Sequence, residues 1–562
     1  MPADAEQKRG IGAALAVFVE RRALVMLALG FASGLPNLLI FDTLSLWLRE
    51  SGLSLKVISI FALATLSYSL KFLWAPLIDR TQVPGLTRLL GHRRSWMILL
   101  QILVMLGLWL ISGADPVKNL GLMAAFAAFV AFVSATQDIV IDAWRIEAAE
   151  VEKQGAMAAA YQWGYRGAMI VAGAAPLLLA EAYSWNLSYA VMAALMLVGV
   201  AGVLGAPREA AHTVRPIHAE GLASRPALEL PEWIGRLAVF GLGALLLGCG
   251  LAADASLLAS GLRGLGLPQA AAMVTEVWAL KPEGVYAQLL AVVAGLGVIV
   301  LAVCPLPGVR TRPGVYLFAA LGDPLRDFLQ RYRGTAALIL ALICLYRLSD
   351  FVLNIMNPFY ADLGFSKIEI AEARKVFGVV MTVLGVGLGG FFVARLGMMR
   401  ALVIGAFAGP LSNLAFGWLA IQGPQLWALF VAIGIDNVAG GISGTCLIAY
   451  MSSLTSAGFT ATQYALFSSL YALPGKLIAS QSGRIVESSA AAADSGGPMM
   501  QLKSLFAGLP PNAYAEALER SHVTPAALGA GYLVFFLYSA VLGIAAVVLA
   551  FVVAAKQQPL KD

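Results

Sequence analysis

Apolar runs of about 20 residues recur along the whole chain, and they constrain its fold more than any other feature. As a helix, a run of that length crosses the roughly 30 Å hydrocarbon core of a bilayer. The composition agrees, since 60% of the residues are hydrophobic and 12% are charged. Soluble domains carry about 25% charged residues. The chain is therefore expected to be an all-α polytopic membrane protein.

The apolar runs predict about 14 membrane spans. They lie near residues 24–47, 57–78, 96–112, 120–143, 157–180, 186–205, 236–260, 285–304, 334–360, 370–394, 399–421, 425–451, 459–481 and 527–555. An even number of spans places both ends of the chain on one side of the membrane. Loops on that side hold about twice as many Lys and Arg as the opposite loops, which predicts cytoplasmic termini.

The order of the spans predicts three parts, namely an N-terminal six-helix bundle, a middle segment with two extra transmembrane helices, and a C-terminal six-helix bundle. Their boundaries are 1–205, 206–333 and 334–562. The middle segment is expected to end in a cytoplasmic amphipathic helix at 316–333. A long external loop at about 482–526 is expected to be mobile at 490–500 and to contain a short helix at 513–520.

Charged residues interrupt the apolar runs at depths where the chain should be inside the membrane. The basic ones are Lys71, Arg166, Arg347 and Lys476, and the acidic ones are Asp42, Asp138, Asp142, Asp350 and Asp436. A charge in hydrocarbon costs at least about 2.5–3.5 kcal/mol on insertion scales, so such residues usually face a water-filled or protein-lined path. The pattern indicates a membrane protein whose polar interior carries its function.

Other function classes are excluded by what the sequence lacks. There is no G-x-x-x-x-G-K-[ST] loop of an ATP-driven pump and no HExxH zinc motif, and the four histidines fall in predicted loops. The four cysteines are scattered and show no metal-ligand spacing. The net charge of +6 is explained by topology, and nucleic-acid binding is not expected because no soluble basic face exists. We therefore expect a transporter without a cofactor or metal.

Five segments carry a family resemblance. They are FASGLP at 31–36, KFLWAPLIDR at 71–80, ATQDIVIDAW at 135–144, DNVAGGISGT at 436–445 and FTATQYALFS at 459–468. These segments resemble the AmpG muropeptide permeases, a branch of the major facilitator superfamily that is also similar to the acetyl-CoA transporters. The resemblance covers residues 24–205 and 334–481. It implies the major facilitator fold, in which the substrate site lies between two six-helix halves near the bilayer midplane.

The resemblance also implies a cargo and an energy source. The cargo is N-acetylglucosamine–1,6-anhydro-N-acetylmuramic acid bearing a short peptide. A monomer in the inner membrane of a Gram-negative bacterium imports it by alternating access, driven by the proton gradient. Uptake feeds peptidoglycan recycling and signals β-lactamase induction, which bears on antibiotic resistance. The alternative is another anionic solute, such as an acetyl-CoA-like thioester or a siderophore, on the same fold.

The candidate substrate-binding residues combine arginines with aromatic and amide side chains. They are Arg166, Arg347, Tyr161, Tyr165, Asn354, Gln463, Tyr464 and Lys476. Arginine binds carboxylate bidentately, and aromatic faces suit the sugar rings of the implied cargo. The alternatives stay open: Arg166 could be held in a structural ion pair, Arg347 could simply neutralise Asp350, and Lys476 could extend to water at the outer membrane edge.

The candidate proton-coupling residues are acids within the spans, namely Asp138, Asp142, Asp350, Asp436 and Asp42. Asp138 and Asp142 share a helix face because they are four residues apart. Asp142 could instead form an ion pair with Arg145 at the membrane edge. Asp436 precedes several glycines that favour close helix packing, and Asp42 could be merely interfacial.

A cluster of charges on the loop after the second span is the candidate gate. It comprises Lys71, Asp79, Arg80, Arg93 and Arg94. Acid-plus-arginine clusters on short cytoplasmic loops can form ties between helices that break and reform as the two halves rock. The alternative is that these residues only anchor the loop on the cytoplasmic side.

Overall fold

The computed structural model describes residues 12, 16–53, 66–208, 222, 225–252, 254–280, 284–305, 310–351, 353–479, 482–496 and 498–557. These residues are helical or lie in turns and loops, and none of them is in a strand. The first half, which we define as the residues before 206, contains η1 (Val17–Val19), α2 (Arg21–Leu38), η2 (Leu39–Thr43), α3 (Leu44–Glu50), α5 (Leu66–Leu70), η4 (Lys71–Leu73), α6 (Ala75–Arg80), α7 (Leu86–Leu90), α8 (His92–Ser112), α9 (Leu120–Ala148), η5 (Val151–Lys153), α10 (Gln154–Ala182), α11 (Trp185–Leu195) and α12 (Leu197–Gly205).

The remaining elements belong to the middle segment and to the second half, which we define as the residues after 333. The middle segment contains α13 (Pro226–Ala252), α14 (Ser256–Gly264), α15 (Pro268–Ala279), α16 (Gly284–Val303), α17 (Arg312–Leu317), η6 (Phe318–Gly322) and α18 (Asp323–Arg331). The second half contains α19 (Ala336–Leu345), α20 (Leu348–Phe351), η7 (Leu353–Ile355), α21 (Met356–Leu363), α22 (Lys367–Ala371), η8 (Glu372–Phe377), α23 (Gly378–Leu396), α24 (Met398–Gln422), α25 (Leu426–Ser453), α26 (Thr460–Ala479), α27 (Ser482–Asp494), η9 (Pro498–Phe506), α28 (Ala517–Ser521) and α29 (Pro525–Lys556).

The described residues contain 10 helices that are long and apolar enough to cross a membrane, or up to 11 if one bent pair counts as a span. Each of the 10 coincides with a span that the sequence predicts. The other predicted spans fall on α10, α26, the broken helices α19 to α21 and the segment that includes α5 and α6. The protein is thus a helical multi-pass membrane protein, while the number of 14 and the side of the termini stay predictions.

Some predicted spans are not continuous helices. In the span predicted at 236–260, α13 ends at Ala252 and α14 begins at Ser256. The span at 57–78 is partly outside the described residues, and its described part breaks at η4 (Lys71–Leu73) between α5 and α6. Pro76 occupies the first turn of α6, and proline disfavours helix in the residue before it because it lacks an N–H and crowds that residue. The span at 334–360 is likewise divided into α19, α20, η7 and α21. Because these segments are not single regular helices, their polar side chains do not follow one helical face.

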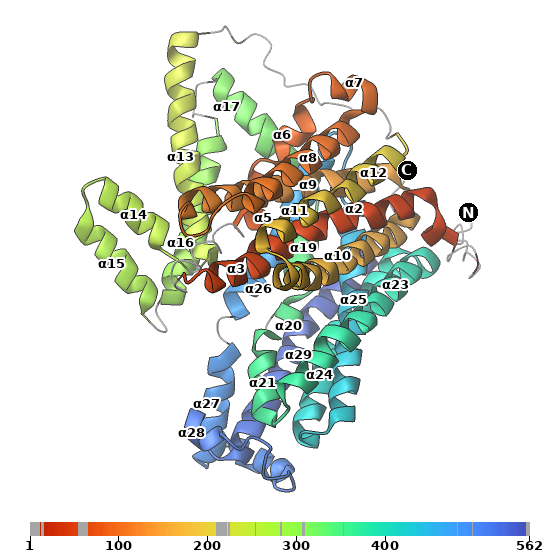
Figure 1. Ribbon diagram of the computed structural model, residues 1–562, viewed down its shortest axis with the longest axis vertical. Coiled ribbons are helices and arrows are strands. Elements are labelled where there is room, and N and C mark those ends of the chain that lie inside the picture. The colour runs from red at the N-terminus through yellow and green to blue at the C-terminus, as the bar shows by residue number, and fades with distance from the viewer. Residues whose placement is uncertain are drawn as a thin grey trace.

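Each half has its own hydrophobic core. One core runs from Ala23 to Ala206 and takes in only Ala461 and Ala465 from the second half. The two larger cores of the second half combine α21, α24, α25, α27 and α29 in one case and α18, α19, α25, α26 and α29 in the other. Figure 1 shows the helices of the first half (red to yellow) gathered beside those of the second (green to blue). The two halves thus have largely separate hydrophobic cores.

The two extra helices of the middle segment pack as a pair on the first half. α13 and α16 lie against each other, with α14 and α15 projecting sideways between them (Figure 1). A small core of Leu247, Leu251, Val292 and Ile299 contacts Phe72 and its neighbours at the break after α5. The middle segment thus rests on the interrupted second span.

Residues 482–526, which the sequence predicts to be an external loop, are helical over part of the stretch that is predicted to be mobile. Residues 490–494 belong to α27, which packs with η9 against α29. Small side chains permit this packing, since Ala490 and Ala493 are at most 1% exposed in the core of the second half. The short helix expected at 513–520 occurs as α28 (Ala517–Ser521). Figure 1 shows α27 and α28 at the end of the molecule opposite to α6 and α7.

Asp494 ties this loop to the start of α29, and its carboxylate gives a testable pH dependence. It accepts hydrogen bonds from Lys503 Nζ (2.7 Å), Thr524 N (3.0 Å) and Thr524 Oγ1 (2.8 Å). These partners, Lys503 first, lower the pKa of Asp494 to about 2. Because this pKa lies below the unfolded value of about 4, the contribution is full above pH ~4 and is lost as the pH falls through about 2.

We expect Asp494→Asn to loosen the loop at neutral pH. Cleavage by trypsin at Lys503 should be faster in the variant, because the amide no longer attracts the lysine. Pepsin should cleave the wild-type loop faster at pH ~2 than at pH ~4, whereas the variant should show a smaller change. Equal cleavage of both proteins at every pH would mean that the Asp494 contacts do not hold the loop.

Candidate functional site

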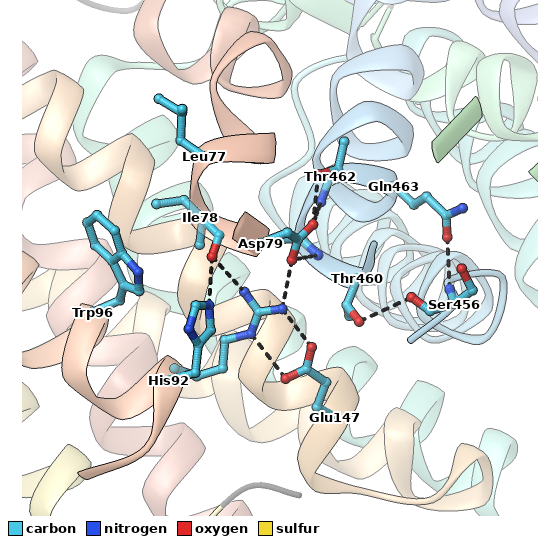
Figure 2. A network of polar contacts seen from close by, with 12 residues as sticks. Leu77, Ile78, Asp79, His92, Trp96, Glu147, Ser456, Thr460, Thr462 and Gln463 are labelled. Carbon is cyan, nitrogen blue, oxygen red and sulfur yellow. Dashed lines mark hydrogen bonds and ion pairs between the residues drawn. The ribbon is translucent and has the colours of Figure 1, made fainter. Parts of the chain in front are cut away.

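Asp79 links the two halves. It lies at the end of α6, and Figure 2 shows its carboxylate directed at the first turn of α26. Oδ2 accepts from the Thr462 backbone N (2.9 Å) and hydroxyl (2.7 Å), and Oδ1 accepts from Ala461 N (3.2 Å). The first N–H groups of a helix lack intrahelical partners, and the residue before α26, Phe459, has no side-chain oxygen to cap them. Asp79 therefore caps a helix of the opposite half, and its charge suits the positive end of that helix.

Arg93 binds the Asp79 carboxylate from within the first half. Its Nη2 lies 2.7 Å from Asp79 Oδ1, and it binds Glu147 at the end of α9 in a bidentate way, with distances of 2.7 and 3.0 Å. The Arg93 side chain is 0% exposed and that of Asp79 is 2% exposed. Burying such a pair is costly unless the remaining donors and acceptors are satisfied, and here they are. His92 Nε2 lies 2.7 Å from the Ile78 carbonyl, so it steadies the turn that presents Asp79.

The helix at the end of the middle segment makes a second link on the same face. Asp327 of α18 accepts hydrogen bonds from Ser456 Oγ (2.8 Å) and Gln463 Nε2 (3.0 Å), and it pairs with Arg331 (2.9 Å). The sequence predicts an amphipathic helix here, and α18 is one. Its apolar side, however, packs on protein: Phe328 is 1% exposed and its ring lies 5.1 Å from that of Phe467 in α26.

Further contacts between the halves run along the first turns of α10. Gln162 Nε2 donates to Thr445 Oγ1 (2.8 Å) and Trp163 Nε1 donates to the Val383 carbonyl (2.9 Å). In the last turn of α9, the helix that precedes α10, Arg145 Nη1 donates to Ser452 Oγ (2.9 Å). These contacts and the Asp79 cluster form what we call the closed face.

Both described ends of the chain lie at the closed face. Lys153 Nζ pairs with Glu20 just before α2 (3.0 Å). At the other end, Tyr450 donates to Gln557, which follows α29 (2.9 Å). The two ends therefore share one side, as an even number of spans requires. On the predicted topology this side is the cytoplasmic one.

A polar cavity of about 300 Å³ lies beyond the closed face, between α10 and the second half. Its lining includes the charged or polar residues Gln162, Arg166, Arg347, Asp350, Tyr360, Arg374, Thr382, Asp436 and Asn437. A neighbouring cavity of about 320 Å³ is lined by Tyr161, Gln162, Tyr165, Arg166 and Met169. The two cavities share Gln162 and Arg166, so together they form one polar path along α10. A further cavity of about 430 Å³ lies on α27, away from these charges.

The second-half wall of the cavity carries an ion pair and a separate acid. Arg347 Nε lies 2.9 Å from Asp350 Oδ2, at the break between α19 and α20. Asp436 of α25 accepts a hydrogen bond from Ser412 Oγ (3.3 Å). The Arg347 side chain keeps 28% of its surface exposed. The pair is therefore neutralised locally and can still reach a ligand in the cavity.

A chain of hydroxyl groups leads from the path along α10 to Asp138. Ser33 donates to the Asp138 carboxylate, and the Ser33 and Tyr161 hydroxyls lie 2.7 Å apart. Because a hydroxyl has one proton to donate, Tyr161 must donate to Ser33 while Ser33 donates to Asp138. Asp138 is 8% exposed. Lys71 is the nearby cation whose charge acts on it, and Asp142 is the nearby acid. Asp138 is thus buried but connected to the cavity wall.

The structure brings some of the predicted residues to the cavities and not others. Tyr161, Tyr165, Arg166, Arg347, Asp350 and Asp436 line them. Gln463 lies in the α18 contact, and Tyr464 lies 5.2 Å from the Arg145 guanidinium at the closed face. The side chains of Asn354 and Lys476 are outside the described residues. In this conformation Gln463 and Tyr464 therefore lie at contacts of α26 with α18 and α9, and neither is among the residues that line the two cavities.

The predicted acids and gate residues also differ in the contacts that they make. Asp142 forms the ion pair with Arg145 (3.2 Å) that was its alternative, and Asp42 is exposed within η2. Asp79 joins the two halves, and Arg93 holds the Asp79 carboxylate from within the first half. Arg80 instead donates to the Ala319 carbonyl of the middle segment (2.7 Å), and Arg94 donates to the Val203 carbonyl within the first half (3.3 Å). Lys71 is 9% exposed at the break after α5.

Three charged residues of this arrangement are not predicted as site residues from the sequence: Glu147, Asp327 and Arg374. Glu147 follows Asp142 and Arg145 on one stretch of helix, which is a signal that could have found it. Arg374 falls near the end of a predicted span, where a basic residue reads as a topology signal. The π-helical stretch η8 that contains Arg374 carries no obvious sequence mark.

Comparison with known proteins gives one family and several named relatives. The model of the Major Facilitator Superfamily matches residues 23–478. The anhydromuropeptide permease of Escherichia coli (strain K12) is 30% identical over 476 residues, which cover 84% of this chain and 76% of that protein. The putative transporter AmpG 4 of Rickettsia conorii is 29% identical over 475 residues, covering 84% and 91%. Among solved structures, the proton:xylose symporter XylE aligns over 95% of both chains with a TM-score of 0.49 and 10% identity.

Proposed function

Because this chain belongs to the major facilitator superfamily, in its branch of AmpG-type permeases, we propose that it imports anhydromuropeptides across the bacterial inner membrane. It is a transporter and not an enzyme. The proposed cargo is the GlcNAc–1,6-anhydroMurNAc disaccharide bearing a short peptide. Import from the periplasm would serve peptidoglycan recycling and β-lactamase induction.

The proposal includes an architecture. A monomer has about 14 spans and cytoplasmic termini, with six-helix bundles at 1–205 and 334–562 and the middle segment 206–333 between them. The two halves rock about the cavity, and the closed face is the cytoplasmic gate. The proton gradient is the driving force, and no cofactor takes part.

One observation carries the proposal beyond family membership, namely the pairing of a closed face with a polar cavity beyond it. The cavity presents arginines from both halves, Arg166 from α10 and Arg347 from the second half. Arginine is suited to carboxylates, and the tyrosines of the adjoining cavity offer flat faces to sugar rings. A substrate site between the two halves, with one face closed, is what alternating access requires.

The test is uptake of labelled anhydromuropeptide into proteoliposomes that contain the purified protein, with and without an imposed proton gradient. We expect accumulation that an uncoupler abolishes. Folded, correctly oriented protein that takes up no anhydromuropeptide would remove this cargo. Competition by an acetyl-CoA-like thioester or a siderophore would then identify the alternative anionic solute.

Asp138 is the proposed site of proton coupling, and Asp138→Asn tests it. The amide cannot release a proton, yet it can still accept the Ser33 hydrogen bond, so the fold should hold. We expect the variant to lose proton-driven accumulation and to retain exchange of labelled for unlabelled substrate across the membrane. The Asp436→Asn variant, measured in parallel, reports on the half-buried acid of the cavity. Unchanged proton-driven accumulation in Asp138→Asn would rule out that role.

A further inference from the structure

The hydroxyl chain that joins Asp138 to the cavity wall has a direction, because each hydroxyl has one proton to donate. The hydroxyl oxygens of Tyr161 on α10 and Ser33 on α2 lie 2.7 Å apart, and either of them can be the donor. Ser33 is also bonded to the carboxylate of Asp138 on α9. Tyr161 is half-buried and lines the cavity of about 320 Å³. The chain therefore runs from a buried acid to a surface that a ligand can contact.

Close packing of α2 on α10 fixes the distance between the two hydroxyls. A methyl group at Gly34, the residue after Ser33, would lie 2.6 Å from the Tyr165 carbonyl oxygen. The backbones of the two helices are therefore in contact at this level, about one turn from Tyr161. Because Ser33 is 0% exposed, bulk water does not compete for its hydroxyl.

A proline in α2 ties the same part of this helix to α9. Pro36 has no N–H, so the Ala32 carbonyl lacks the intrahelical donor four residues ahead. Gln137 Nε2 donates to this carbonyl from the neighbouring helix (3.1 Å). Because Gln137 precedes Asp138 in the sequence, the bond holds the carboxylate beside Ser33. A reversal of the chain therefore needs a movement of protons and no movement of helices.

Other charged and titratable groups face Asp138 without belonging to the chain. Asp142 lies one turn further along α9, and Lys71 is the nearby cation at the break after α5. Tyr68 and Tyr165 are neighbouring phenols on which the charge of Asp138 acts. These groups influence the pH at which Asp138 binds a proton, whereas the hydroxyl chain carries the consequence to the cavity.

The direction of the chain depends on whether Asp138 carries a proton. A carboxylate only accepts, so Ser33 donates to it and Tyr161 donates to Ser33. The Tyr161 oxygen then presents only lone pairs to the cavity. A protonated Asp138 can donate to Ser33, and Ser33 then donates to Tyr161, whose own proton becomes free to bond a ligand. Protonation thus changes this point of the cavity wall from an acceptor into a donor.

We propose that the hydroxyl chain couples proton binding to substrate binding, with Asp138 as the proton site, Ser33 as a positioning residue and Tyr161 as the donor to a substrate oxygen. The inference rests on the proposed function and deepens it. The substrate oxygen is a neutral acceptor, namely a hydroxyl or amide carbonyl oxygen of a sugar. Asp138 takes up one proton, and none is transferred to the substrate. By reciprocity, substrate binding promotes proton uptake as strongly as the proton promotes substrate binding.

The test measures substrate affinity and proton uptake together. The purified full-length protein is titrated with anhydromuropeptide in a calorimeter from about pH 5 to pH 9, where buried carboxylic acids titrate. Two buffers of different ionisation enthalpy give the number of protons taken up per bound ligand. The variants are Ser33→Ala, Tyr161→Phe and Asp138→Asn. Tyr68→Phe is the matched control, because Tyr68 also lies beside Asp138 but donates to Ser134 (3.0 Å).

We expect wild type to bind anhydromuropeptide about fivefold more tightly at the acidic end of this range, which is the effect of one neutral hydrogen bond. Binding should be accompanied by net proton uptake. Ser33→Ala keeps the acid and the phenol but breaks the chain, so its affinity should not change with pH and the uptake should vanish. Tyr161→Phe and Asp138→Asn should behave likewise, and Tyr68→Phe should behave as wild type.

Thermal unfolding without ligand shows whether each variant is folded, and Tyr161→Phe, which loses one hydroxyl at the cavity wall, decides the question if Ser33→Ala is not. An affinity that still depends on pH in Tyr161→Phe as in wild type would overturn the inference, because the charge of Asp138 then acts without the hydroxyls. A wild-type affinity that is equal at every pH would also overturn it, while the proposed cargo stands. If folded wild type binds no anhydromuropeptide at any pH, the proposed function itself is wrong.

Discussion

Replacing Arg347 with alanine is expected to reduce uptake of anhydromuropeptide to background. Arg347 lines the central cavity and lies 2.9 Å from Asp350. Alanine removes a proposed substrate contact and also removes the arginine that pairs with Asp350. Breaking a fully buried pair costs about 3–5 kcal/mol, and we take this range as an upper bound because the pair is partly exposed to the cavity. Uptake into proteoliposomes and the amount of protein in the membrane are the two measurements.

The double variant Arg347→Ala/Asp350→Ala separates the two effects. It removes both charges, so it should restore the abundance that the single variant loses. Uptake should remain at background in both, because the arginine is absent. If the double variant recovers uptake, Arg347 serves only to neutralise Asp350 and its assignment to the substrate site is wrong. Arg347→Lys, which keeps the charge without the bidentate geometry, should retain a small fraction of uptake.

Replacing Asp79 with asparagine is expected to open the closed face. The carboxylate makes three hydrogen bonds to the start of α26 and one to Arg93. Bonds to charged groups contribute about 1.5–3 kcal/mol each. Losing even one of them favours the open conformation by at least about tenfold. A transporter that cannot close this face should also lose most of its net uptake.

Thiol labelling provides the measurement for Asp79→Asn. Thr460 is 2% exposed at the interface, so a Thr460→Cys substitution in a background without the native cysteines reports the opening. We expect faster labelling with Asp79→Asn. The matched control is Asp115→Asn, because Asp115 lies on an exposed loop at the far end of α8. Slow labelling in Asp79→Asn, equal to that of the control, would falsify the role of Asp79 as a lock.

The sequence predicts the helical membrane fold well because the membrane spans are long apolar runs. Charged residues within these runs are rare, so each one is easily recognised as a candidate site residue. Arg166, Arg347, Asp350 and Asp436 were singled out by this argument alone, and the structure brings all four to one cavity. Their function there stays a prediction. The Asp79 and Arg93 pair follows similarly from a cluster on a short loop.

The sequence does not predict which residues far apart along the chain contact each other. The sequence predicts Gln463 and Tyr464 as substrate-binding residues, and in the structure Asp79 and Asp327 bind the same first turns of α26. Nothing local to α26 reveals that its cap comes from α6. The helix at 490–494 is a second example, because an Ala/Ser/Gly-rich stretch reads as a linker. Its small side chains let α27 pack on α29.

Two glycines show how strictly α2 and α10 are joined. A methyl group at Gly30 would lie 2.1 Å from the Tyr161 carbonyl oxygen, and one at Gly164 would lie 1.9 Å from that of Leu27. Neither position tolerates a side chain unless the two backbones separate. In a saturation-mutagenesis screen for growth, substitutions at both positions should be tolerated as poorly as substitutions at a ligand-binding residue. A map of mutational intolerance would therefore include residues that do not contact the substrate. Their intolerance is explained by the short distance between the backbones of α2 and α10.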